Sequence, residues 1–124
     1  MADSNDKKQL LWSDKKRGPF GLPISFTRYT LTAEKLTVER GIFVRKTDEV
    51  RLYRIRDVTL IRNLRERALG LGSIEVASTD HSMGVFKIER VPYSRRLHAL
   101  LSDLVEESRD RHNVTINETN SSKA

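Results

Sequence analysis

Cysteine is absent from this chain, and aromatic residues make up only 6% of it. Without thiols the chain can form neither disulfide bridges nor thiolate metal sites, and a reducing cell interior is compatible with this composition. No apolar run approaches the roughly 18 residues that a membrane-spanning helix needs. Residues 1–16 also lack the apolar core of a signal peptide. We therefore expect a single cytoplasmic domain in these 124 residues, and peripheral attachment to a membrane stays open.

The residue patterns that enzymes need are also missing. His81, His98 and His112 are far apart and lack the spacing of metal ligands. The segment 80–82 (Asp-His-Ser) has the residue types of a catalytic triad, but neighbours in one hairpin loop cannot converge from held positions. The segment 70–72 (Gly-Leu-Gly) precedes a strand pattern, whereas a phosphate-binding loop precedes a helix. We expect no catalysis, no metal and no cofactor.

Positive charge is in excess. The net charge is +6, and the segment 40–67 alone holds nine Lys or Arg against four Asp or Glu. Such a basic field attracts phosphates, anionic lipid surfaces or acidic proteins. A solvated strand face, with arginine stems covering apolar surface, is the alternative interpretation. The candidate anion-binding residues are Arg45, Arg51, Arg54, Arg62, Arg65 and Arg67.

Strand patterns dominate the middle of the chain. Alternation of apolar and polar residues, as at Leu36 and Val38, predicts strands with one face in the core. The segment 47–49 is expected to be a polar turn, 65–68 a basic turn, and Ile55 to fill the core from a tight turn. The predicted strands are 24–31, 35–40, 42–46, 50–53, 57–64, 73–78 and 85–90.

One helix is expected near the end. The segment 92–94 (Pro-Tyr-Ser) has the residues of a helix start. The apolar residues that follow share one stripe at helical spacing: Tyr93, Leu97, Leu100, Leu101, Leu104 and Val105. Such a stripe must be buried, and the sheet is its available partner. We therefore expect a flexible arm at 1–23, a domain at 24–111 and a disordered tail at 112–124.

The order of these motifs resembles a known family. The resembling segments are Tyr29 to Thr32, Lys35 to Gly41, Val50 to Val58, and Arg67 to Val76. Together they are similar to the bacterial pleckstrin-homology family, over about residues 24–108. The resemblance implies a mainly β, PH-like barrel of about seven strands in two near-orthogonal sheets, capped by a C-terminal helix. It also implies no catalytic activity and no consensus ligand. Members are often linked to membrane-spanning segments, but no hydrophobic span precedes this domain, so we do not expect membrane anchoring.

Two functions remain open. A protein-interaction or self-association module is consistent with exposed edge strands and an adhesive segment at 10–12 (Leu-Leu-Trp). An anion-binding module would use the six arginines to hold acidic lipid headgroups or RNA. Phe43 and Tyr53 are the only aromatic residues in the basic segment, which weakens the RNA hypothesis, because RNA recognition usually adds stacking side chains.

Overall fold

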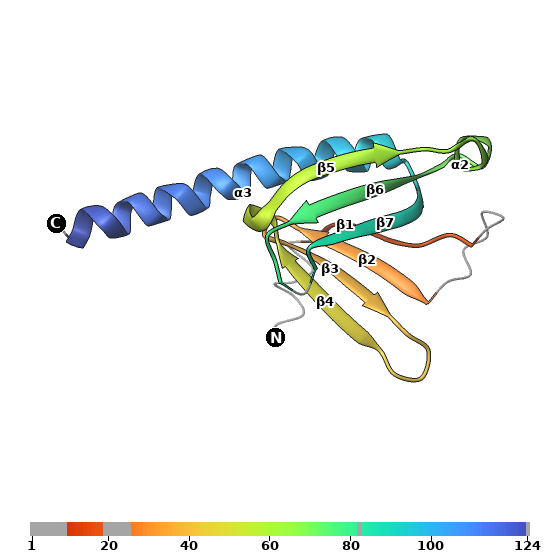
Figure 1. Ribbon diagram of the computed structural model, residues 1–124, viewed down its shortest axis with the longest axis horizontal. Helices are drawn as coiled ribbons and strands as arrows, with labels where there is room; N and C mark the ends of the chain where they lie inside the picture. Colours follow the sequence, from red (N-terminus) through yellow and green to blue (C-terminus); the bar gives the residue numbers. More distant parts are fainter. Residues whose placement is uncertain (1–9, 19–25, 82, 124) are drawn as a thin grey trace.

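The computed structural model describes residues 10–18, 26–81 and 83–123, which form two antiparallel sheets and a long C-terminal helix (Figure 1). The first sheet has the order β1 (Leu10–Lys15), β2 (Thr27–Thr32), β3 (Lys35–Arg40), β4 (Lys46–Arg51). The second has the order β5 (Ile55–Ile61), β6 (Leu71–Ser78), β7 (Val85–Pro92). A 3-10 turn, η1 (Leu52–Arg54), joins the sheets, α2 (Leu64–Ala68) joins β5 to β6, and α3 (Ser94–Lys123) follows β7. In this described part, no helix is both long and apolar enough to cross a bilayer.

The core lies between the two sheets and the first turns of α3. Leu36 and Val38 of β3 are buried, as their alternation predicts, and Ile55 is fully buried at the start of β5. Helix α3 packs against η1, β5 and β6. Its predicted stripe is buried at Leu97, Leu101, Leu104 and Val105. The predicted mainly β fold of two sheets with one C-terminal helix is therefore confirmed.

The prediction of a strand at 42–46 is wrong. Residues 41–45 form an exposed connection between β3 and β4, and only Lys46 of the predicted strand belongs to one. The segment 47–49, predicted as a turn, instead lies in β4 and pairs with β3. The chain reverses earlier because Gly41 adopts a φ of +117°, which residues with a side chain rarely do.

Residues 10–15 also differ from the expectation of a flexible arm. They form β1, which pairs antiparallel with β2, and Trp12 packs against the core. Without β1, β2 would be the edge strand of the sheet and would offer unpaired backbone groups, which β1 satisfies. The described residues thus contain seven strands, but β1 takes the place of the strand expected at 42–46.

Helix α3 continues past the predicted start of a disordered tail at residue 112. The ring of His112 stacks on that of Tyr53, with 3.8 Å between centroids, and Arg111 Nη2 donates to the carbonyl oxygen of Ala33 at 3.1 Å. These tertiary contacts hold the helix beyond the end of its apolar stripe. Tyr93, in contrast, lies before the helix with a φ of +55° and is exposed, so its predicted place on the buried stripe is wrong.

Candidate anion-binding surface

Helix α2 turns its single acidic residue into the fold. Asn63 caps the helix, since its Oδ1 accepts a hydrogen bond from the backbone N–H of Glu66 at 2.7 Å. The Glu66 carboxylate is buried and accepts from Ser73 Oγ at 2.8 Å. With that carboxylate turned inward, the exposed residues of α2 are Leu64, Arg65, Arg67 and Ala68.

A short hydrogen-bonded chain attaches α2 to the second sheet. Ser73 Oγ donates to Glu66 and also accepts from the backbone N–H of Arg90 at 3.1 Å. This bond lies where the pairing of β6 and β7 shifts register, between Gly72 and Ile74. Arg90 has a φ of +47° there. The serine therefore occupies a break in the strand ladder and fixes the position of α2 relative to it.

The start of α3 lies beside Arg62 and Gly70, which precede and follow α2. Gly72 of β6 is directly beneath Ser94 and Arg62, because a Cβ on Gly72 would lie 2.2 Å from Ser94 Oγ and 2.9 Å from Arg62 Cγ. Arg62 Nε donates to the carbonyl oxygen of Leu71 at 3.2 Å. A shallow depression of about 260 Å³ results, and its lining residues are Arg62, Gly70, Tyr93, Ser94, Arg95 and Arg96.

We call Arg62, Arg65, Arg67, Arg95 and Arg96 the arginine patch. Among the residues that the structure describes, none of these five forms an ion pair with a carboxylate. The first turn of α3 contains no acid, and its two arginines face the positive end of the helix dipole, where cations are disfavoured. Arg96 Cζ lies 5.6 Å from the ring centroid of Tyr93. Helix stability therefore does not explain the two arginines at this position.

The six arginines selected from the sequence do not share one rim. Arg62, Arg65 and Arg67 lie together at α2, whereas Arg45 is in the β3–β4 turn and forms an ion pair with Glu39 at 3.2 Å. The other two, Arg51 and Arg54, lie at the η1 end of β5, and α2 follows its opposite end (Figure 1).

Each arginine of this η1 pair has a partner of its own. Arg51 Nη1 lies 3.8 Å from Glu34 Oε2. The Arg54 guanidinium lies 5.8 Å from the centroid of the Tyr53 ring. Sequence reasoning missed Arg95 and Arg96, although two adjacent arginines before the apolar stripe of α3 were a usable signal.

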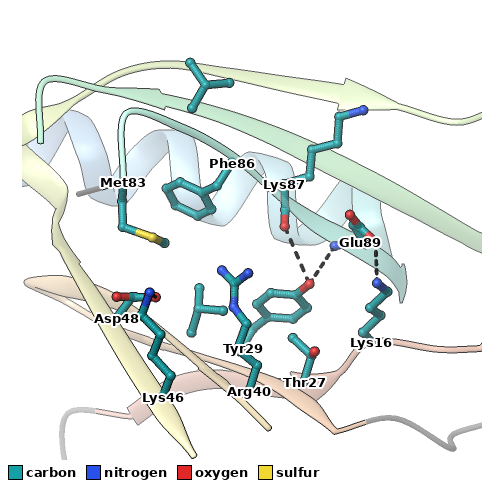
Figure 2. A pocket seen from close by; sticks show the side chains of 12 residues that line it. Lys16, Thr27, Tyr29, Arg40, Lys46, Asp48, Met83, Phe86, Lys87 and Glu89 are labelled. Carbon is teal, nitrogen blue, oxygen red and sulfur yellow. Dashed lines mark hydrogen bonds and ion pairs between the residues drawn. The ribbon is translucent and has the colours of Figure 1, made fainter. Parts of the chain in front are cut away.

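A second concave region lies between the first sheet and β7 (Figure 2). This cleft has a volume of about 420 Å³. Its charged lining residues are Lys16, Arg40, Lys46, Lys87, Asp48 and Glu89. Both acids are paired with a lysine: Glu89 Oε2 lies 2.5 Å from Lys16 Nζ, and Asp48 Oδ2 lies 3.9 Å from Lys46 Nζ. Two of the four cations are therefore compensated by ion pairs, and Arg40 and Lys87 leave the lining with a net charge of +2.

Tyr29 bridges the two sheets inside this cleft. Its hydroxyl donates to the carbonyl oxygen of Lys87 at 3.5 Å and accepts from the backbone N–H of Glu89 at 3.1 Å (Figure 2). Burial raises the pKa of the Tyr29 phenol above its ordinary value of 10.0. The hydrogen bond and charge of Lys16 lower the pKa of Glu89 below its ordinary value of 4.5, against the opposing effect of burial. The phenol is thus a structural link that stays protonated at neutral pH.

The described part of the chain contains no group of three or more His, Cys, Asp or Glu side chains that could hold a metal ion. Its surface instead offers a basic patch beside an exposed aromatic ring, carried on a PH-like fold. These features define the class as a PH-like binding module. The chain belongs to the bacterial PH domain family, whose family model matches residues 21–105. No curated protein and no solved structure matches the chain significantly. PH-like domains are generally non-catalytic modules.

Proposed function

We propose that this domain is a non-catalytic module that binds acidic membrane surfaces through the arginine patch. The observation that carries the proposal is that Arg62, Arg95 and Arg96 line one depression beside the exposed Tyr93 ring. The neighbouring helix α2 adds Arg65 and Arg67, and its acid Glu66 is turned inward and hydrogen-bonded to Ser73. Basic residues near an anionic leaflet each contribute about 1 kcal/mol of attraction. Five of them therefore supply at most about 5 kcal/mol, which corresponds to binding in the sub-millimolar range.

The apolar side chains that neighbour the arginine patch favour lipid over RNA. Leu64 is 80% exposed and Tyr93 is 72% exposed, and Leu69 is also exposed. Peripheral membrane proteins combine such side chains with Lys and Arg, because the apolar groups enter the interface while the cations stay with the headgroups. RNA-binding surfaces instead use several aromatic rings for base stacking, and among the described residues Tyr93 is the one ring that lines the depression with these arginines.

Co-sedimentation with vesicles tests this proposal. We expect the full chain to sediment with phosphatidylcholine vesicles only when they contain phosphatidylserine, and to be released by high salt. The double variant Arg65→Glu, Arg67→Glu should lose about 100-fold or more in affinity, because two charges are reversed within the patch. The matched control is Arg51→Glu, Arg54→Glu, which makes the same change in net charge at the η1 end and should bind nearly as wild type.

Three results would overturn this assignment. Negligible sedimentation with acidic vesicles at low salt would reject lipid binding. An equal loss of vesicle affinity in the Arg65→Glu, Arg67→Glu variant and in the Arg51→Glu, Arg54→Glu variant would mean that net charge, and not the arginine patch, drives binding. An RNA gel shift that disappears only in the Arg65→Glu, Arg67→Glu variant, without vesicle binding, would assign the patch to RNA instead.

Self-association is a second candidate function, and the position of β1 favours it. This strand is at the edge of the first sheet, and its Leu10 and Leu11 side chains are exposed. Edge strands can pair with a second copy of the chain. Sedimentation equilibrium at micromolar concentrations should then show a dimer that Leu11→Lys weakens. A monomer across the whole concentration range would exclude this candidate.

A further inference from the structure

The turn between β3 and β4 exposes three consecutive large apolar side chains. Ile42 is 58% exposed, Phe43 is 98% exposed and Val44 is 82% exposed. We call these three residues the apolar tip. A single exposed apolar side chain is ordinary, but a contiguous group at the end of a hairpin is typical of an interaction site.

The shape of this turn is held by contacts at its base. The backbone N–H of Gly41 donates to the carbonyl oxygen of Phe26 at 3.2 Å, which ties the turn to the segment that enters β2. A Cβ on Gly41 would lie only 1.9 Å from the carbonyl oxygen of Val44, so the turn closes as tightly as it does because residue 41 is glycine. Arg45 pairs with Glu39 across the hairpin. The tip is thus presented to solvent by a defined turn.

Cations surround the apolar tip. Arg40 and Lys46 are exposed at the ends of β3 and β4, and Arg45 directly follows Val44. Glu39 offsets the charge of Arg45, and Asp48 lies 3.9 Å from Lys46. Arginine and lysine beside an apolar tip can keep their charges at the headgroup level while the tip enters the interface.

The apolar tip and the arginine patch lie at the same end of the molecule. Figure 1 shows the β3–β4 turn and α2 at one end of the long axis, while α3 runs toward the other end. A flat surface that approaches this end meets both features. A bilayer is such a surface, and its acidic headgroups match the charge of the patch while its interface accepts the apolar tip.

We propose that the apolar tip inserts into the interfacial region of an acidic bilayer when the arginine patch binds the headgroups. This inference rests on the proposed function and extends it, because it adds a second contact and sets the orientation of the domain. The axis of α3 then points away from the membrane, with Phe43 among the most deeply inserted side chains.

Site-specific labelling tests the insertion, because the chain has no native cysteine and the dye therefore reacts only with the introduced one. Phe43→Cys carries one polarity-sensitive dye, and Val114→Cys is the control, because Val114 is also exposed but lies in the C-terminal part of α3, which runs toward the other end in Figure 1. With phosphatidylserine vesicles we expect a blue shift and an emission increase of about twofold or more at position 43 and no change at position 114. The same samples are assayed by co-sedimentation.

The outcomes separate the two proposals. If both labelled proteins sediment with the vesicles and the dye at position 43 does not respond, insertion is rejected and surface binding stands. If neither sediments, both proposals fail. In the unlabelled chain, Phe43→Ser should weaken vesicle binding by about tenfold, the expected effect of losing one buried phenyl group, without a change in the thermal unfolding midpoint. Wild-type binding by Phe43→Ser would also overturn the insertion.

Discussion

Gly72→Ala is the sharpest test of how α3 is seated on the second sheet. A Cβ at this position would lie 2.2 Å from Ser94 Oγ, 2.7 Å from Ser94 Cβ and 2.9 Å from Arg62 Cγ. Ser94 is buried at the start of α3, so it cannot move aside unless the helix moves with it. Inserting a methyl group into such a site costs about 1–3 kcal/mol.

A smaller effect acts in the opposite direction. Replacing glycine by alanine reduces the freedom of the unfolded chain and stabilises the fold by about 0.4–1 kcal/mol where the backbone permits it. The net expectation is a decrease of about 1–2 kcal/mol in the free energy of unfolding. Urea denaturation followed by circular dichroism measures it, and the midpoint should fall by roughly 0.5–1 M, given the usual dependence on urea for a domain of this size.

Gly84→Ala is the matched control. Its added Cβ would meet the carbonyl oxygen of Asp80 at 3.8 Å, which is an ordinary contact, so the free energy of unfolding should change by no more than about 0.5 kcal/mol. If Gly72→Ala were as stable as Gly84→Ala, the close seating of Ser94 and Arg62 over β6 would be refuted. The placement of the arginine patch beside α2 would then lose its structural basis.

Two further predictions concern the cleft. Tyr29→Phe removes the hydroxyl that joins β2 to the backbone of Lys87 and Glu89, and should lower the free energy of unfolding by about 1–2 kcal/mol in the same urea assay. An unchanged midpoint would show that this link does not stabilise the sheets. Lys16 lowers the pKa of Glu89 in the folded protein below its ordinary value of 4.5. The ionised Glu89 carboxylate therefore stabilises the fold above pH 4.5, and this stabilisation is lost as the pH falls through the pKa of the folded state. Glu89→Gln should therefore lose less thermal stability than wild type on acidification below about pH 5. The difference should be less than about 1 kcal/mol, because the Lys16–Glu89 pair is partly exposed. An identical dependence of thermal stability on pH in the two proteins would contradict this.

Local periodicity was sufficient to predict which face of a strand or helix is buried, where that element packs one face against the core. The alternation around Leu36 and Val38 and the helical stripe through Leu97 and Leu101 predicted buried faces that the structure has. The same rule failed at Ile42 and Val44, which alternate as strand residues do but have no sheet surface to cover. An apolar pattern states a preference for burial, and it does not supply the partner surface.

The arginine patch likewise combines residues that the sequence places together with residues that only the fold brings close. The sequence by itself placed Arg62, Arg65 and Arg67 close together, because they are neighbours along the chain. Only the tertiary structure brought Arg95 and Arg96 beside Arg62, through the packing of Ser94 over Gly72, and separated Arg51 and Arg54 from the arginines at α2 along the length of β5. The physical reason is that propensity and periodicity act over a few residues, whereas the meeting of surfaces depends on contacts between segments far apart in the chain.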